Sequence, residues 1–184
     1  MTQRQAVALA LLDGHAAAQA EDAFRLIYAD AFADPPYNET DAEVNATFRR
    51  FRSQTRKAVF RAALAWTEGG EPVGMAYGYP LSSDTGWWDQ LTEPVAGDMR
   101  REDGHRTFGL MELAVRTSWR GQGVARRLHE TLLDGIAAKR VLLNVHPGST
   151  AAAAVYRAWG YRKIGEARPW AGAGLHDLML LDLG

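Results

Sequence analysis

The chain has 184 residues, of which 47% are hydrophobic and 23% are charged, a mixture typical of one globular domain and not of a disordered chain. Its 21 Lys and Arg against 22 Asp and Glu give a formal net charge of −1, so no global field attracts nucleic acid or an anionic membrane. The lack of cysteine excludes disulfides, thiolate metal sites and cysteine nucleophiles, and it fits a reducing cytoplasm. We therefore expect a single domain, residues 1–184, in the cytoplasm.

The first third of the chain predicts one strand followed by two helices. Residues 5–12 are apolar from Ala6 onward and precede a turn signal, which is typical of a strand. Residues 16–33 repeat apolar side chains at three- and four-residue spacing and predict a helix. Thr40 and Glu43 have the spacing of a capping box, so we expect a second helix from there to about residue 56.

The middle of the chain predicts two strands and then a long irregular segment. Residues 58–66 and 72–79 flank a hairpin-type connection. Residues 80–107 lack sustained periodicity, and we interpret them as a functional lid or a disordered segment. No stretch approaches the roughly 18 apolar residues of a membrane span, so we expect no membrane partner.

The second half of the chain predicts alternating strands and helices. The predicted strands are 107–116, 140–145, 161–166 and 175–182, and the predicted helices are 121–138 and 149–159. Within the first of these helices an apolar residue recurs every four positions and indicates a core-facing stripe, formed by Val124, Leu128, Leu132 and Ile136.

A glycine-containing turn at 120–125 (RGQGVA) joins a predicted strand to a predicted helix. The first N–H groups of a helix lack intrahelical partners and carry partial positive charge. Gly121 and Gly123 allow close approach of a bulky anion, and no acidic residue occurs between Leu113 and His129. These residues predict a phosphate-binding turn, with an ordinary strand–helix turn as the alternative.

Two motifs resemble those of the GCN5-related N-acetyltransferases (GNAT). Residues 120–125 match R/Q-x-x-G-x-G/A, and residues 149–161 are similar to N-x-x-A-x-x-L-Y-x-x-x-G-F, with Ser149 in place of the usual Asn. The resemblance implies an α/β (α+β) fold. It would be a single GNAT domain with a mixed, mostly antiparallel sheet of about six to seven strands, flanked by about four helices. Strands 4 and 5 would be splayed.

The resemblance also implies acetyl-CoA as co-substrate and no metal. Its pantetheine arm would pair with a strand backbone and its pyrophosphate would lie on the turn. The residues implied are Leu113, Ala114, Val115, Arg120, Gly121, Gln122, Gly123, Val124, Ala125, Arg126, Ser149 and Ala152.

Two residues are catalytic candidates for acetyl transfer to an amine. Tyr156 matches the general-acid tyrosine of the family and lies one helical step, roughly 100°, from an apolar stripe at Ala151, Val155 and Trp159. Glu112 is the candidate base, because burial in an apolar strand would raise its pKa. A packing tyrosine and a solvent-facing rim charge are the alternatives.

The acceptor is expected to be a small-molecule or peptide amine. By analogy with the family, Tyr37, Trp87, Trp88 and Asp89 could line its site. A homodimer with contacts near the C-terminal strands is compatible with the family. The alternatives are a non-catalytic acyl-CoA-binding sensor and a nucleic-acid-associated protein that uses the basic run at 49–61.

Overall fold

The computed structural model describes residues 6–184. The chain divides into two compact units: the first comprises Met1–Tyr79 and Glu112–Ile136, and the second comprises Pro80–Met111 and Ala137–Gly184. One seven-stranded sheet has the order β1-β2-β3-β4-β5-β7-β6, and β4 contributes residues to both units. The expected mixed, mostly antiparallel fold is confirmed.

The strands are β1 (Val7–Asp13), β2 (Arg61–Thr67), β3 (Pro72–Pro80), β4 (Thr107–Val115), β5 (Arg140–Val145), β6 (Arg162–Ala167) and β7 (His176–Asp182). The helices are α1 (Gly14–Gln19), α2 (Glu21–Ala31), α3 (Asp41–Gln54), α4 (Gly97–Arg100), α5 (Val124–Leu133) and α6 (Thr150–Ala158). Two short 3-10 helices are η1 (Trp87–Gln90) and η2 (Thr117–Trp119).

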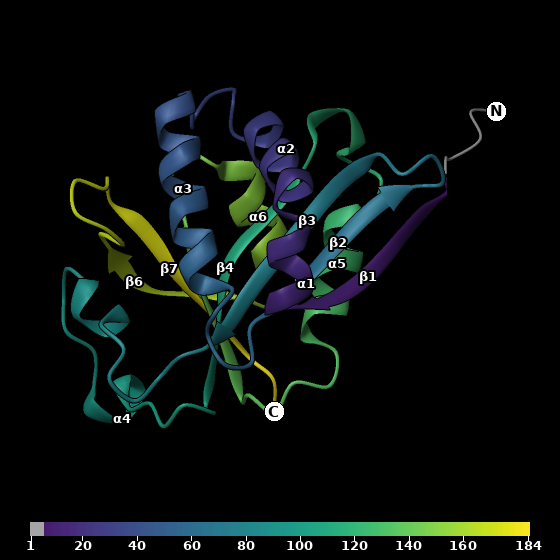
Figure 1. Cartoon of the computed structure of the whole chain (residues 1–184). Coiled ribbons are helices and arrows are strands. Elements are labelled where there is room, and N and C mark those ends of the chain that lie inside the picture. Colours follow the sequence, from purple (N-terminus) through teal and green to yellow (C-terminus); the bar gives the residue numbers. More distant parts are fainter. Residues whose placement is uncertain (1–5) are drawn as a thin grey trace. The chain divides into compact units, whose positions relative to one another are not determined.

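The first unit is an antiparallel β1–β2–β3 ribbon covered by helices. β1 pairs with β2 from Val7 opposite Thr67 to Asp13 opposite Arg61. Helices α1 and α5 both contact β1 and β2, and Figure 1 shows α1 in front of these strands and α5 behind them. Because both faces are covered, β2 is buried along most of its length.

Aromatic side chains from α2, α3 and β3 form the core of the first unit. The rings of Phe24, Phe51 and Tyr77 pack with centroids 5.1 to 6.3 Å apart. Phe48 joins them from α3, whose N-terminus has the predicted capping box between Thr40 and Glu43. Aromatic packing and a capped helix therefore fix the position of α2 and α3 within this unit.

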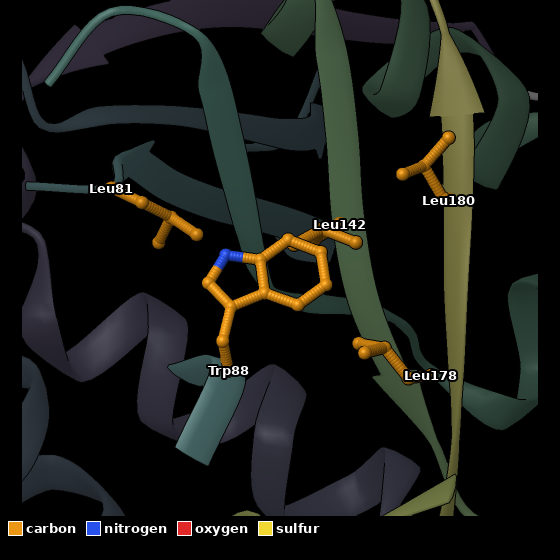
Figure 2. Packing of buried hydrophobic residues seen from close by; sticks show 5 residues of the cluster. All are labelled: Leu81, Trp88, Leu142, Leu178 and Leu180. Carbon is orange, nitrogen blue, oxygen red and sulfur yellow. The ribbon is translucent and has the colours of Figure 1, made fainter. Parts of the chain in front are cut away.

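The second unit contains the parallel strand pair expected of the fold. Residues Thr107–Gly109 of β4 lie opposite Arg140–Leu142 of β5, whereas β7 pairs antiparallel with both β5 and β6. Figure 2 shows the indole of Trp88 lying among Leu81, Leu142 and Leu178, which form part of the core of this unit. The splay of β4 and β5 beyond this register stays a prediction.

The segment 80–107 is folded, so the alternative of disorder is wrong. Its carboxylate Glu102 is buried and accepts hydrogen bonds from Trp88 Nε1 at 3.0 Å and Thr107 Oγ1 at 2.7 Å. Arg140 on β5 pairs with the same carboxylate at 2.9 Å, and its guanidinium lies 5.1 Å from the Trp88 ring centroid. A buried polar cluster, invisible as a sequence pattern, holds the segment in place.

Two predicted helices, and the number of helices, differ from the predictions. The helix expected at 16–33 is two helices, because the chain leaves helical geometry at Ala20. The helix expected at 121–138 ends at Leu133, because Gly135 has a left-handed φ of 70°, so Ile136 lies outside its stripe. With this division and with the short helix α4 in the segment 80–107, the described residues hold six α-helices and not about four. Residue 5 of the first predicted strand lies outside the described residues.

Candidate functional site

The predicted phosphate-binding turn has open space and uncapped amides. Gly121 and Gly123 have left-handed φ values of 73° and 81°, and a Cβ at either position would have no atom within 4 Å. Gly123 is the N-cap of α5 and has no side chain to cap it, and the first turn of α5 holds no acidic residue. The N–H groups at the start of α5 are therefore left for an anionic ligand, which fits a pyrophosphate.

The strand that leads into this turn is partly open at its centre. β4 is buried at both ends but half-buried at Met111, Glu112 and Leu113, whereas Ala114 and Val115 are buried. A partly exposed strand segment of this kind suits an extended ligand that adds to the strand. The turn residues Gly121, Gln122 and Gly123 are exposed, and Val124 and Ala125 begin α5.

The arginines of the turn differ in what they contact. The guanidinium of Arg120 donates to the Val115 carbonyl at 3.3 Å and to the Ala31 carbonyl at 3.0 Å. Arg126 is exposed and pairs with the exposed Glu130 at 2.9 Å, an interaction that contributes little to stability. Arg126 is thus the more accessible cation, and its contact with phosphate stays a prediction.

Glu112 lies in an environment that favours its protonated form. Burial, together with the nearby charge of Glu39, raises the pKa of Glu112 to about 8, although Arg50 acts in the opposite direction. As a whole residue Glu112 is half-buried in β4, and burial of its carboxyl group is the main cause of the raised pKa. A carboxyl group with a pKa near neutrality can exchange a proton with a substrate that reaches it.

Glu39 is a carboxylate near Glu112 that the sequence analysis did not identify. Its Oε1 accepts a hydrogen bond from the Tyr28 hydroxyl at 2.7 Å, and its N–H donates to the Phe32 carbonyl at 2.9 Å. Burial raises the pKa of Glu39 as well. Nothing in the sequence marks this residue, because its proximity to Glu112 arises from the tertiary packing of α2, α3 and β4.

The second unit carries the other catalytic candidate. Tyr156 is half-buried on α6, and its ring contacts those of Trp159 and Tyr161 at centroid distances of 5.8 and 5.4 Å. The predicted core stripe of this helix is wrong, since Ala151 and Val155 are exposed and Ala153 is buried. Tyr156 therefore lies on the partly buried side of α6, and its role as acid stays a prediction.

The two remaining cofactor candidates also lie on or beside α6. Ser149 is the N-cap of the helix, but its hydroxyl makes no capping hydrogen bond, and Ala152 is half-buried. Their contact with a cofactor stays a prediction.

The acceptor-site candidates fall in different surroundings. In the first unit, Tyr37 is half-buried and packs edge-on against Phe32 at 4.6 Å. In the second, Trp88 is a core residue, Trp87 is half-buried, and Asp89 is exposed and pairs with Arg100. Their contact with an acceptor stays a prediction.

Within residues 6–184, no helix is long and apolar enough to cross a membrane. The same residues contain no group of three or more His, Cys, Asp or Glu side chains arranged to hold a metal ion.

Comparison with known families tests the resemblance to the GNAT family. The model described as "Acetyltransferase (GNAT) family" matches residues 22–161, a range that includes the glycine-containing turn, Glu112 and Tyr156. The chain belongs to the GNAT acetyltransferase family. No curated protein matches it significantly.

Several solved structures have the same fold as this chain. A Pyrococcus horikoshii OT3 protein has a TM-score of 0.64 at 17% identity, with 96% of this chain and 99% of that chain covered. The ribosomal-protein-S18-alanine N-acetyltransferase of Escherichia coli has a TM-score of 0.62 at 19% identity, covering 97% and 95%. The PaiA N-acetyltransferase of Thermoplasma acidophilum, in complex with coenzyme A, has a TM-score of 0.60 at 9% identity, covering 96% and 99%. At these identities the likeness shows the fold alone.

Proposed function

We propose that this GNAT protein is an N-acetyltransferase that moves an acetyl group from acetyl-CoA to a primary amine by direct attack in a ternary complex. The observation that carries the proposal is the match of the GNAT acetyltransferase family model to residues 22–161, and it is supported by Glu112, a carboxyl group whose pKa burial raises to about 8. An amine is protonated at neutral pH and becomes a nucleophile only after losing a proton, so a base of this strength suits the reaction.

The donor would be held by the turn and the strand before it. The backbone N–H groups of the turn and of the start of α5 would donate hydrogen bonds to the pyrophosphate, and the β4 backbone at the half-buried residue Leu113 would pair with the pantetheine arm. A strand N–H near Ala114 or Val115 would then donate to the thioester oxygen as negative charge develops there.

The reaction then needs one base and one acid. Glu112 takes one proton from the protonated amine, and the neutral nitrogen attacks the thioester carbonyl carbon and forms the amide bond, while the carbon–sulfur bond breaks. Tyr156 donates a proton to the departing thiolate and is reprotonated by the second proton that the nitrogen loses. A tyrosine hydroxyl has an ordinary pKa of about 10, so it is protonated at neutral pH and can act as this acid.

The acceptor proposed here is a small-molecule or peptide amine. The carboxyl groups of Glu39 and Glu112 favour a cationic group in the first unit, and the ring of Tyr37 offers an apolar contact beside Phe32. Trp87 and Asp89 remain candidate acceptor contacts from the second unit. A homodimer and a role of the basic run at 49–61 remain untested expectations.

The test is thiol release from acetyl-CoA with a panel of amines, followed by single-turnover kinetics of Tyr156→Phe. Loss of the hydroxyl should slow the chemical step by about 10²-fold. Tyr161→Phe is the matched control, because it removes a hydroxyl from the same aromatic cluster and should leave the chemical step unchanged. An undiminished chemical step in Tyr156→Phe would refute the acid assignment.

The alternative function is an acyl-CoA-binding sensor without catalysis. Tight binding of CoA with no thiol release from any amine would favour it over the enzyme.

A further inference from the structure

The C-terminal end of α2 contacts the segment that follows β4. The Thr117 N–H donates to Asp30 Oδ1 at 2.8 Å, and Arg116 Nε donates to Asp30 Oδ2 at 3.3 Å. In return, Arg120 Nη2 donates to the Ala31 carbonyl at 3.0 Å. Helix α2 and the segment after β4 therefore satisfy polar groups of each other. Asp30 accepts hydrogen bonds from the segment, and Arg120 donates a hydrogen bond to a carbonyl group at the end of the helix.

Asp30 occupies a position that the helix itself disfavours. The C-terminal end of a helix carries partial negative charge, so a carboxylate in the last turn of α2 is repelled by the macrodipole. Burial acts to raise the pKa of Asp30, but the hydrogen bonds from Thr117 and Arg116 outweigh it and lower that pKa. The carboxylate is therefore held in its charged form by the segment after β4 and not by its own helix.

Arg116 extends this contact to the β2–β3 hairpin. Its Nη1 donates to Glu71 Oε1 at 2.6 Å, and its backbone N–H donates to the Val73 carbonyl at 2.9 Å. Its side chain is 21% exposed, so these interactions are partly shielded from solvent. The stretch from Arg116 to Arg120 is thus attached to α2 and to the hairpin immediately before the open amides of Gly121–Gly123.

We propose that Asp30 is a positioning residue for the donor turn: by fixing Thr117 and Arg116, it sets the direction of the backbone N–H groups that bind the diphosphate of the donor. This inference rests on the proposed binding of a CoA thioester. Asp30 does not contact the donor itself. Its effect on donor affinity is confined to the diphosphate, because the pantetheine arm pairs with β4 and not with the turn.

The test compares two donors, acetyl-CoA and S-acetylpantetheine, which lacks the diphosphate and the nucleotide attached to it. In Asp30→Ala we expect kcat/KM for acetyl-CoA to fall about tenfold through KM, and CoA affinity in calorimetry to fall equally. The value of kcat/KM for S-acetylpantetheine should not change. Asp30→Asn should recover most of the affinity, because its amide oxygen can still accept from Thr117. Asp22→Ala, an exposed acid on the same helix, is the control and should match the wild type.

A second variant removes the same hydrogen bond from the other side. Thr117 is the first residue of η2, and Arg116 before it has φ −55° and ψ 142°, so a proline at position 117 fits the backbone. Thr117→Pro deletes the N–H that Asp30 accepts and should cause the same selective loss for acetyl-CoA. It keeps the inference testable if Asp30→Ala does not fold.

Other results would overturn the inference. An equal loss with both donors would make Asp30 a general structural residue. Tighter CoA binding by Asp30→Ala would show that the carboxylate acts mainly by repelling phosphate. Wild-type affinity for CoA in both Asp30→Ala and Thr117→Pro would refute the positioning role of Asp30 but not the proposed function. A wild-type protein that does not bind CoA would instead refute the proposed function.

Discussion

Glu112 and its charged neighbours make the pH dependence of the reaction predictable. A base must be deprotonated, so kcat/KM should rise with pH and level off above about 8, the pKa of Glu112. Glu39 raises that pKa and Arg50 lowers it. Glu39→Gln should therefore move the acid limb of the profile to lower pH, and Arg50→Gln should move it to higher pH. Asp41→Asn, an exposed acid at the start of α3, is the control. Shifts of the same sign in both variants would contradict Glu112 as the titrating base.

The same carboxyl group predicts how stability changes with pH, without reference to activity. Its pKa is raised from an ordinary value of 4.5 to about 8, so between these values the folded state binds more protons than the unfolded state. Stability should be greatest below about pH 4.5 for this group and should fall as pH rises towards 8. Glu112→Gln should lose less stability than the wild type over that range in chemical denaturation at a series of pH values. Parallel curves for the two proteins would contradict the raised pKa.

At the scale of the turn and helix α5, substitutions of two glycines distinguish the effect of backbone strain on stability from the effect of a side chain on ligand binding. Gly123→Ala places a side chain at a left-handed φ, which should cost about 1–2 kcal/mol of stability, and its Cβ would crowd the diphosphate. Gly172 in the second unit also has a left-handed φ, 80°, and open space around a Cβ. Gly172→Ala should therefore cost the same stability and leave CoA affinity unchanged. Thermal denaturation and calorimetry measure both, and equal affinity losses would argue against the turn as the donor site.

Elements whose signals are local were predictable from the sequence, and contacts between distant elements were not. The capping box of α3, the apolar stripe of α5 and the glycine turn each depend on residues a few positions apart. The break at Ala20 was missed because no glycine or proline marks it, and an alanine-rich stretch favours a continuous helix.

The residues of the candidate site also divide into those that the sequence marks and those that only the fold brings together. Glu112 could be singled out as a carboxylate in an apolar strand, but Glu39 and Asp30 could not, because tertiary packing alone brings them to Glu112 and Thr117. Arg120 lies in the motif that implies a cofactor contact, but its guanidinium donates hydrogen bonds to two carbonyl groups of the protein itself. Sequence motifs therefore identify the candidate turn, whereas the side chains that contact the segment before it can be found only from the fold.

At the scale of the whole molecule, we predict that the two units unfold together, because the strand β4 belongs to both of them. This is the behaviour expected of a single domain over residues 1–184. Its residues Thr107–Met111 belong to the second unit and Glu112–Val115 to the first. Glu102→Ala leaves Arg140 as a buried, unpaired charge, since both side chains are at most 5% exposed, and it should cost about 3–5 kcal/mol in the second unit. Hydrogen exchange should then show an equal loss of protection in β2 of the first unit. Arg162→Gln, which loses only a surface ion pair with Asp182, should change neither unit. Full protection of β2 in Glu102→Ala would instead define two independently folding units.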